Sequence, residues 1–276
     1  MSSFSADWLA LRERHDHAAR SASVLGELAA WASTGRGARR ALDLGSGTGS
    51  TLRALAPVVP ALRDWTLAEH DPGLIASGGR ILVAQPETAA LRWRYAELDL
   101  APGVPDALLD GVDLVTASAL IDLVSAAWLE RLVRAVRQHR VATYVALSYD
   151  GRIAWTPVDP DDGLVHRLFD RHQRSDKGFG PALGPAAAST LERALAALAG
   201  RTVSAASDWL LGPDDTAIQA AMVDSLAAAA RAVDPLAAAL IDAWSGRRRA
   251  LIAAGSSTLR VGHRDVLYRP PATRTA

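Results

Sequence analysis

The sequence predicts an α/β fold in which helices cover both faces of a doubly wound, mostly parallel sheet. Short apolar runs alternate with helical segments through the first half of the chain, at the spacing of parallel strands joined by crossover helices. Residues 141–148 form a continuous β-branched and aromatic run, as in a buried strand. Residues 41–49 form an apolar run that breaks into alternating glycines, which indicates a strand, a tight turn and the start of a helix.

The individual elements follow from the same patterns. Val124, Trp128, Leu132 and Val136 repeat every four residues and mark one apolar helix face. The seven predicted strands lie at residues 41–44, 65–68, 92–98, 111–116, 141–148, 202–210 and 258–268. One or two helices are predicted at residues 7–31, and further helices at 50–56, 124–136, 164–174 and 186–199, from 213 and at 235–254. Loops are predicted at 155–163 and 175–185. We expect a single domain, 1–276, with an N-terminal helical cover at 1–35, an insertion or lid at 150–185 and a helical insertion at 212–255.

Composition narrows the class of protein. The chain has 276 residues, zero formal net charge and no cysteine, so disulfides and thiolate chemistry are excluded and a general polyanion-binding surface is disfavoured. Apolar runs are shorter than the roughly 18 residues of a membrane span, and residues 1–16 lack a signal-peptide core. We therefore expect a cytoplasmic protein with no membrane partner. Lys177 is the single lysine of an arginine-rich chain, which marks it as a candidate site residue.

The glycine turn follows directly on the apolar run that carries Asp43. Glycine permits positive φ and lets a ligand approach the backbone, although a tight turn without a ligand has the same pattern. The sequence Asp-Leu-Gly-Ser-Gly-Thr-Gly resembles motif I of the class I S-adenosylmethionine-dependent methyltransferases. The resemblance implies S-adenosylmethionine as cofactor, S-adenosylhomocysteine as product, and a seven-stranded sheet of order 3-2-1-4-5-7-6 with strand 7 antiparallel. It assigns cofactor binding to Asp43, Gly45, Ser46, Gly47 and Gly49.

Acidic residues follow the second and third predicted strands. A carboxylate can accept two hydrogen bonds from a vicinal diol, and Glu69, 20 residues after the last of the three glycines, resembles the family's ribose acid. Asp71 is the second candidate, and His70 between them is also assigned to the cofactor site; either acid could instead cap the next helix. Asp99 resembles the acceptor for the adenine amine, with Leu100 donating a backbone N–H to the ring, and turn formation is the alternative.

Small residues follow the fourth predicted strand, as in the family's motif IV, where they let the methyl group and its acceptor approach. Ala117 and Ser118 are therefore expected to line the cofactor, and Asp122 lies where many small-molecule methyltransferases have a polar active-site residue. In many members of the family an N-terminal helix covers the cofactor. Such a helix would bring Arg20 to the methionyl carboxylate, and a solvated helix face is the alternative.

Methyl transfer from a sulfonium needs a positioned acceptor and the exclusion of water, and a base only where the acceptor must lose a proton. Asp122 and His172 are the expected catalytic residues, and His166 and His263 are further candidates for the base. The segment after the fifth strand is polar, glycine-hinged and basic, which favours a lid that binds a carboxylate or phosphate; an ordinary surface loop is the alternative. The expected acceptor-binding residues are His166, Arg174, Lys177 and Phe179.

The predicted function is transfer of a methyl group from S-adenosylmethionine to an O or N atom of a small, anionic molecule (EC 2.1.1.-). A methyltransferase acting on a protein or RNA is one alternative. Nucleic acid is disfavoured by the charge balance, and because the Asn- or Asp-Pro-Pro-aromatic signature expected of nucleic-acid methyltransferases is missing after the fourth strand. A regulatory or partner protein that binds the cofactor without transferring a methyl group is another. A dinucleotide-dependent oxidoreductase is disfavoured by the glycine spacing. We expect no bound metal, because the histidines lack ligand spacing.

Overall fold

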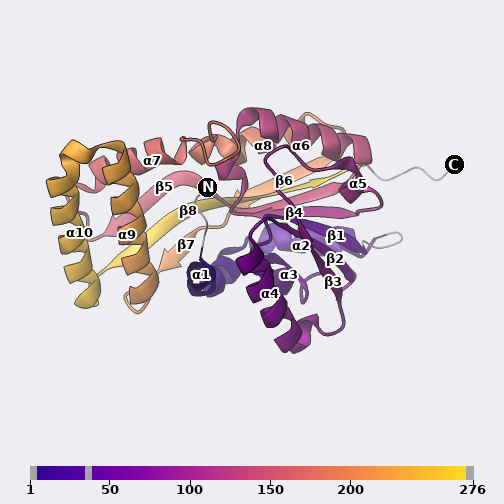
Figure 1. The fold of residues 1–276 in the computed structure, drawn as a ribbon, viewed down its shortest axis with the longest axis horizontal. Helices are drawn as coiled ribbons and strands as arrows, with labels where there is room; N and C mark the ends of the chain where they lie inside the picture. The colour runs from indigo at the N-terminus through magenta and orange to yellow at the C-terminus, as the bar shows by residue number, and fades with distance from the viewer. Residues whose placement is uncertain (1–4, 35–38, 272–276) are drawn as a thin grey trace.

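The computed structural model describes residues 5–34 and 39–271, so the ends of the predicted N-terminal cover lie outside the described residues. The strands are β1 Arg40–Leu44, β2 Asp64–Glu69, β3 Arg92–Glu97, β4 Leu114–Ser118, β5 Ala142–Thr156, β6 Arg201–Ala206, β7 Trp209–Leu211 and β8 Thr258–Arg269. They form one sheet of order β3-β2-β1-β4-β5-β8-β6, with β7 paired to β8 (Figure 1). The strands β1 to β5 are parallel and β8 is antiparallel to β5. The predicted fold class and strand order are confirmed, with β8 in the seventh place.

The single strand predicted at residues 202–210 is wrong, because it divides into β6 and β7 at Ser207 and Asp208. Ser207 N donates to the carbonyl oxygen of His263 at 2.9 Å, and the Asp208 carboxylate accepts from His263 N at 3.2 Å. A side chain that replaces a backbone partner interrupts the ladder at this point. Two short strands therefore pair with β8 in succession, which raises the number of strands to eight within the described residues.

Helices connect and cover the strands. Four of them begin at a polar residue, Ser5, Ser21, Asp71 or Ser125, whose side chain accepts a hydrogen bond from the first turn. The α-helices are α1 Ala6–Ala19, α2 Ala22–Ala32, α3 Ser50–Leu55, α4 Pro72–Ala84, α5 Asp106–Leu109, α6 Ala126–His139, α7 Asp162–Gln173, α8 Ala187–Ala196, α9 Thr216–Val233 and α10 Ala238–Ala253. The 3₁₀ helices are η1 Pro86–Thr88, η2 Ile121–Leu123, η3 Gly184–Ala186 and η4 Pro235–Ala237.

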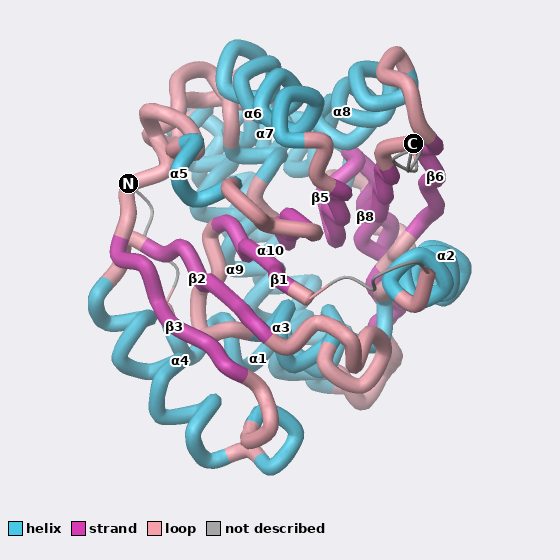
Figure 2. Tube along the Cα trace, turned by 90° about the vertical axis from the view of Figure 1, so that its right-hand side faces the viewer, coloured by secondary structure: helices cyan, strands magenta, loops and turns pink. Residues whose placement is uncertain are grey.

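Two apolar clusters lie on opposite faces of the sheet, as predicted. On one face, α6 and α8 bury residues such as Trp128 and Leu191 against β1, β4 and β5. On the other face, α2, α3 and α4 bury residues such as Leu28, Leu52 and Leu82. Figure 2 shows these two groups of helices above and below the strands. The carboxyl ends of the parallel strands are thereby held at one edge of a rigid, double-sided core.

A third apolar cluster lies beyond the parallel part of the sheet. It is built from the far ends of β5 and β8 (residues 149–156 and 258–263) with β7, α7, α9 and α10, and we call this region the arm (Figure 1). Trp155 and Thr156, predicted to begin a loop, instead extend β5 because they pair with Leu259 and Thr258 of β8. In the described part of the chain, every helix is too short or too polar to cross a bilayer.

Candidate active site

The glycine turn joins β1 to α3 and forms one wall of a cavity. Gly45, Gly47 and Gly49 have φ of +62°, +54° and +82°, which is the left-handed region that favours glycine. A Cβ atom added at Gly47 would lie 3.0 Å from Leu9 Cδ1, and one at Gly45 would lie 3.2 Å from Leu120 Cδ1. The left-handed conformation therefore favours glycine at these two positions, and a Cβ would also require the neighbouring leucine side chain to shift. Gly45 and Gly47 line the cavity together with Ser46, whereas Gly49 does not.

Glu69 ends β2 beside the turn and is only 5% exposed. Its Oε2 accepts from Gly47 N at 2.8 Å, and its Oε1 accepts from His70 N at 2.8 Å and Asp71 N at 3.0 Å. These backbone donors fix the carboxylate at the cavity wall, which Glu69 lines. Each carboxylate oxygen has more than one lone pair, so the side chain retains capacity for a ligand hydroxyl.

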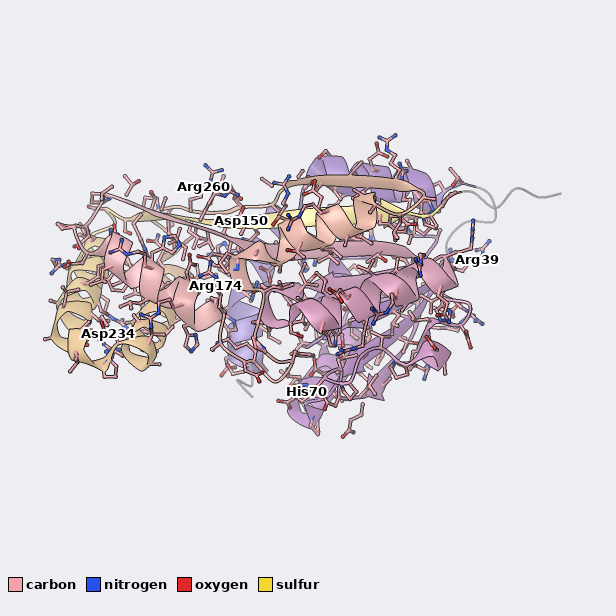
Figure 3. All side chains as sticks on the ribbon, turned by 90° about the horizontal axis from the view of Figure 1, so that it is seen from above. Arg39, His70, Asp150, Arg174, Asp234 and Arg260 are labelled. Carbon is pink, nitrogen blue, oxygen red and sulfur yellow. The ribbon has the colours of Figure 1, made fainter. Side chains whose placement is uncertain are left out.

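Asp71 and His70 also line the cavity, but their side chains serve local structure. Asp71 Oδ1 accepts from Gly73 N at 2.7 Å and Leu74 N at 3.2 Å, and it caps α4. This is the alternative that the sequence left open for an acid at this place. His70 is exposed (Figure 3), with Nδ1 3.1 Å from Glu69 Oε1. Glu69 is therefore the better placed of the two acids for a ligand.

The loop after β3 forms another part of the cavity wall, with Asp99 and Leu100. Asp99 is exposed, and its Oδ1 accepts from Ala101 N at 2.9 Å, so it also shapes a turn. Leu100 is buried, and its carbonyl oxygen accepts from Trp128 Nε1 at 2.6 Å. Phe179 packs edge-on against Trp128, with ring centroids 5.8 Å apart. The segment that carries Phe179 thus reaches the wall that Leu100 forms.

Arg20 lies at the junction of α1 and α2 and is buried against the cavity. Its Nη2 donates to Ser118 Oγ at 3.0 Å, and its Nη1 donates to the hydroxyl of Tyr144 at 3.4 Å. Within the described residues its Nε is buried without a hydrogen-bond partner. Because a buried polar group without a partner is costly, this guanidinium is suited to an anionic ligand in the cavity.

The helix α1 lies over the glycine turn. Cavity-lining residues recur along it at spacings of three and four, which places them on one helix face: Leu9, Arg12, Asp16 and, just after the helix, Arg20. Arg53 ties this helix to the turn, since its Nε donates to Glu13 Oε1 at 2.6 Å and its Nη1 donates to the carbonyl oxygen of Thr48 at 2.6 Å. The charged face of α1 is therefore directed inward rather than solvated.

Three of the residues assigned to the cofactor do not line the cavity: Asp43, Gly49 and Ala117. Asp43 is fully buried, and its Oδ1 accepts from Thr116 Oγ1 of the neighbouring strand at 2.6 Å. Burial raises the pKa of Asp43 to about 7. Asp43 therefore joins β1 to β4 instead of contacting the cofactor. Ala117 is likewise buried, in β4.

The expected catalytic residues lie near the cavity without lining it. Asp122 belongs to η2, between Leu120 and Leu123, which do line it. Its Oδ1 is buried without a partner among the described residues, and burial raises its pKa to about 6. The Nδ1 of His172 lies 3.2 Å from Lys177 Nζ, and burial lowers the pKa of this histidine.

The two other histidines considered as a base lie in the arm. His166 Nε2 is 2.9 Å from the hydroxyl of Tyr149 and outside the cavity lining. His263 is buried, with its ring centroid 5.1 Å from that of Trp209, and burial lowers its pKa to about 3. A histidine this weakly basic is a poor proton acceptor near neutral pH.

Only two of the four expected acceptor-binding residues line the cavity, Lys177 and Phe179. Arg174 does not: it is exposed, and its Nη1 donates back to the carbonyl oxygen of Asp170 at 3.0 Å (Figure 3). Lys177 is half-buried, and burial lowers the pKa of its ammonium group. The basic segment thus contributes one cation to the cavity rather than a cluster.

Sequence reasoning expected an N-terminal helix over the cofactor but missed Arg12 and Asp16, which line the cavity from α1. Arg12 donates from Nε and Nη2 to the Asp16 carboxylate at 2.8 and 3.1 Å, and its guanidinium lies 5.0 Å from the Trp209 ring centroid. Asp16 also accepts from Trp209 Nε1 at 3.0 Å. The sequence held a signal for this, because Leu9, Arg12 and Asp16 are spaced by three and four residues and therefore share one helix face. In the described residues there is no group of three or more acidic, histidine or cysteine side chains that could hold a metal ion.

Comparison with known proteins gives similarities to solved structures alone: no family model matches the chain, and neither does any curated protein. A SAM-dependent methyltransferase from Geobacter sulfurreducens, in complex with S-adenosyl-L-homocysteine, has a TM-score of 0.48 and 18% identity over 98% of this chain and 100% of that one. One from Thiobacillus denitrificans, in the same complex, has a TM-score of 0.45 and 16% identity over 96% and 98%. An O-methyltransferase family protein from Burkholderia thailandensis has a TM-score of 0.48 and 14% identity over 97% of this chain and 59% of that one.

Proposed function

We propose that this chain transfers a methyl group from S-adenosylmethionine to an O or N atom of a small, anionic molecule. One observation carries the proposal: a single cavity is lined by the left-handed glycines Gly45 and Gly47, by Glu69 with its carboxylate held by backbone N–H groups, and by Arg20, whose Nε has no partner in the described residues. These groups match the parts of the cofactor, namely a backbone cradle, a diol acceptor and a partner for a carboxylate. Ser46 Oγ, also buried and unpartnered in the described residues, adds a further polar atom to the cradle.

The residues present fit the cofactor end to end. Glu69 would hold the ribose hydroxyls, Asp99 and the Leu100 backbone the adenine, and Arg20 the methionyl carboxylate. When bound, S-adenosylmethionine supplies a methyl group on a sulfonium, which is an excellent leaving group. The chain's own residues orient the acceptor and exclude water, and the cover of α1 over Gly47 supports this role.

The acceptor class follows from the charges that remain in the cavity. Arg12 is already paired with Asp16, whereas Lys177 hydrogen-bonds only to His172 Nδ1 and Ser175 Oγ in the described part of the chain. An ammonium group without a carboxylate partner favours an anionic acceptor. Leu9, Leu120 and Leu123 give the same cavity an apolar lining, so the acceptor has an apolar body beside its negative charge.

Proton removal is assigned to Asp122, which lies between two cavity-lining leucines. Its raised pKa of about 6 suits a carboxylate that takes a proton near neutral pH. His172 would act on the same side of the cavity through its hydrogen bond to Lys177, as a positioning partner of that ammonium group.

The proposal is tested by incubating the protein with S-adenosylmethionine and a panel of small aromatic and aliphatic carboxylates, phenols and amines. S-Adenosylhomocysteine release is measured by mass spectrometry, and we expect turnover with at least one anionic compound. Replacing Lys177 by Met should raise the KM of that compound about tenfold, while Arg174→Met, outside the cavity, should leave it unchanged. Binding of S-adenosylhomocysteine without turnover on any compound, protein or RNA would instead indicate a regulatory cofactor-binding protein.

A further inference from the structure

We propose that Tyr144 and Asp265 are positioning residues that direct Arg20 at the carboxylate of the cofactor's amino-acid tail, and so make the site select ligands that carry this tail. The inference rests on the proposed function, because it needs a ligand of this class in the cavity. It begins from three residues that lie far apart in the sequence, on the α1–α2 junction, β5 and β8. Nothing in the local sequence pattern connects them.

Asp265 is completely buried in β8 and accepts three hydrogen bonds. Its Oδ2 accepts from the Tyr144 hydroxyl at 2.9 Å and from Ser21 N at 3.0 Å, and its Oδ1 accepts from Leu147 N at 2.9 Å. Leu147 has φ of +56° at the bulge in β5, a conformation that this hydrogen bond helps to hold. One carboxylate therefore fixes the start of α2, the bulge of β5 and the phenol of Tyr144.

Two of these contacts converge on Arg20. Ser21, whose backbone N–H is held by Asp265, is the residue directly after Arg20, so the backbone of Arg20 is fixed at the helix junction. The Tyr144 hydroxyl donates to Asp265 and accepts from Arg20 Nη1, and its ring centroid lies 5.8 Å from the guanidinium carbon. Burial raises the pKa of Tyr144, which keeps the phenol neutral and able to donate.

The charge arrangement is unusual because the buried guanidinium has no carboxylate in direct contact among the described residues. A buried cation needs a compensating negative charge, and a direct ion pair would supply it. Here Asp265 supplies negative charge through the intervening hydroxyl of Tyr144, and Asp16 adds to it at longer range. The arrangement compensates the charge of Arg20 while leaving its Nε without a protein partner, which is what recognition of a ligand carboxylate requires.

The consequence is a selectivity that can be measured with two known compounds. S-Adenosylhomocysteine carries the amino-acid tail, whereas 5′-methylthioadenosine has the same adenosine and sulfur but lacks that tail. Contacts with Glu69, Asp99 and Leu100 are open to both compounds, and the contact with Arg20 only to the first. A residue that acts through Arg20 should therefore affect one compound and spare the other.

The experiment compares dissociation constants of both compounds by calorimetry for the wild type, Tyr144→Phe, Arg20→Met and the double variant. We expect Tyr144→Phe to raise the dissociation constant of S-adenosylhomocysteine about tenfold and that of 5′-methylthioadenosine less than twofold. Adding Tyr144→Phe to Arg20→Met should cause no further loss, since the phenol acts through the guanidinium. Tyr268→Phe is the matched control, because it removes a hydroxyl from the same part of the sheet, and that hydroxyl donates to the Ala199 carbonyl oxygen rather than to Asp265.

Equal weakening of both compounds, or a full additional loss in the double variant, would overturn the inference. Asp265→Asn is the second variant and should show the same selective loss, with thermal unfolding recorded to establish that it is folded; if it does not fold, Tyr144→Phe decides. A wild type that fails to bind S-adenosylhomocysteine at all removes the proposed function itself. A wild type that binds it, with Tyr144→Phe unchanged, removes only the positioning role.

Discussion

The parallel part of the sheet and the arm both bury charged side chains, but they differ in whether those side chains find all their partners within the protein. In the arm, buried charge is matched within the chain: Arg248 is completely buried, and Asp162, the Pro157 carbonyl oxygen and the Trp155 ring surround its guanidinium. At the carboxyl ends of the parallel strands, Arg20 and Asp122 each keep a buried polar atom without a partner in the described residues. Fully matched charges indicate structure, and incompletely matched charges beside a cavity indicate a ligand.

The largest expected effect tests the structural side of this comparison. Arg248 Nε donates to Asp162 Oδ1 at 3.0 Å and its Nη1 donates to the Pro157 carbonyl oxygen at 2.7 Å. Arg248→Met should lower the free energy of unfolding by about 3–5 kcal/mol, measured by urea denaturation, because Asp162 loses its buried partner. The dissociation constant of S-adenosylhomocysteine should not change where the variant is folded. Arg249→Met, an exposed neighbour, is the control and should change stability by about 0.5 kcal/mol or less.

The glycine turn should respond in the opposite way. Gly47→Ala places a Cβ 3.0 Å from Leu9 Cδ1 and forces an alanine to adopt a left-handed backbone conformation. The affinity for S-adenosylhomocysteine, measured by calorimetry, should therefore fall about a hundredfold. Gly246→Ala in α10 meets no atom within 4 Å and should leave binding unchanged while stabilising the helix by about 0.5–1 kcal/mol. Equal effects of the two substitutions on binding would remove the distinction between the regions.

Glu69→Gln tests the ribose acid. The backbone N–H groups of Gly47, His70 and Asp71 all donate to this carboxylate, and an amide group would direct its own N–H toward one of them. We expect about a tenfold to hundredfold loss of S-adenosylhomocysteine affinity. Glu97 pairs with Glu69 in register at the end of β3 but is exposed, so Glu97→Gln should have no effect. A Glu97 effect as large as that of Glu69 would contradict the assignment.

The pH dependence of turnover tests Asp122. Because burial raises its pKa to about 6, the carboxyl becomes able to accept a proton only as the pH rises through about 6. With an acceptor that must lose a proton, kcat/KM should therefore rise through that pH, and Asp122→Asn should abolish this limb of the profile. If the same limb persists in the variant, another group is the base.

How much of this was predictable depends on whether the signal is local. The glycine turn and the alternation of strands and helices follow from short runs, because positive φ and alternating elements leave direct traces in sequence. The strand order and the place of Glu69 were expected from the family resemblance instead. Arg20 could be named as a carboxylate partner, but its supports, Tyr144 and Asp265, lie on strands that only the folded sheet brings together. The spacing of residues along the sequence does not indicate a contact between side chains on such distant strands.

Errors arose where a side chain's direction decided the outcome. Arg174 and Lys177 both belong to the basic segment after the fifth strand, yet Arg174 turns back to the end of α7 and only Lys177 reaches the cavity. Asp43 lies two residues before the first glycine of the turn, yet as a strand residue it accepts a hydrogen bond from Thr116 on the neighbouring strand. The split of the predicted sixth strand likewise depends on the Asp208 side chain taking a backbone partner.

Every assignment made to the cavity depends on its binding S-adenosylmethionine and its product. Calorimetric titration of the wild-type protein with S-adenosylhomocysteine, and in parallel with NAD, tests this binding most directly. We predict saturable binding of S-adenosylhomocysteine at one molecule per chain and no heat of binding with NAD. Binding of NAD with no response to S-adenosylhomocysteine would contradict this prediction and indicate that the cavity binds a dinucleotide.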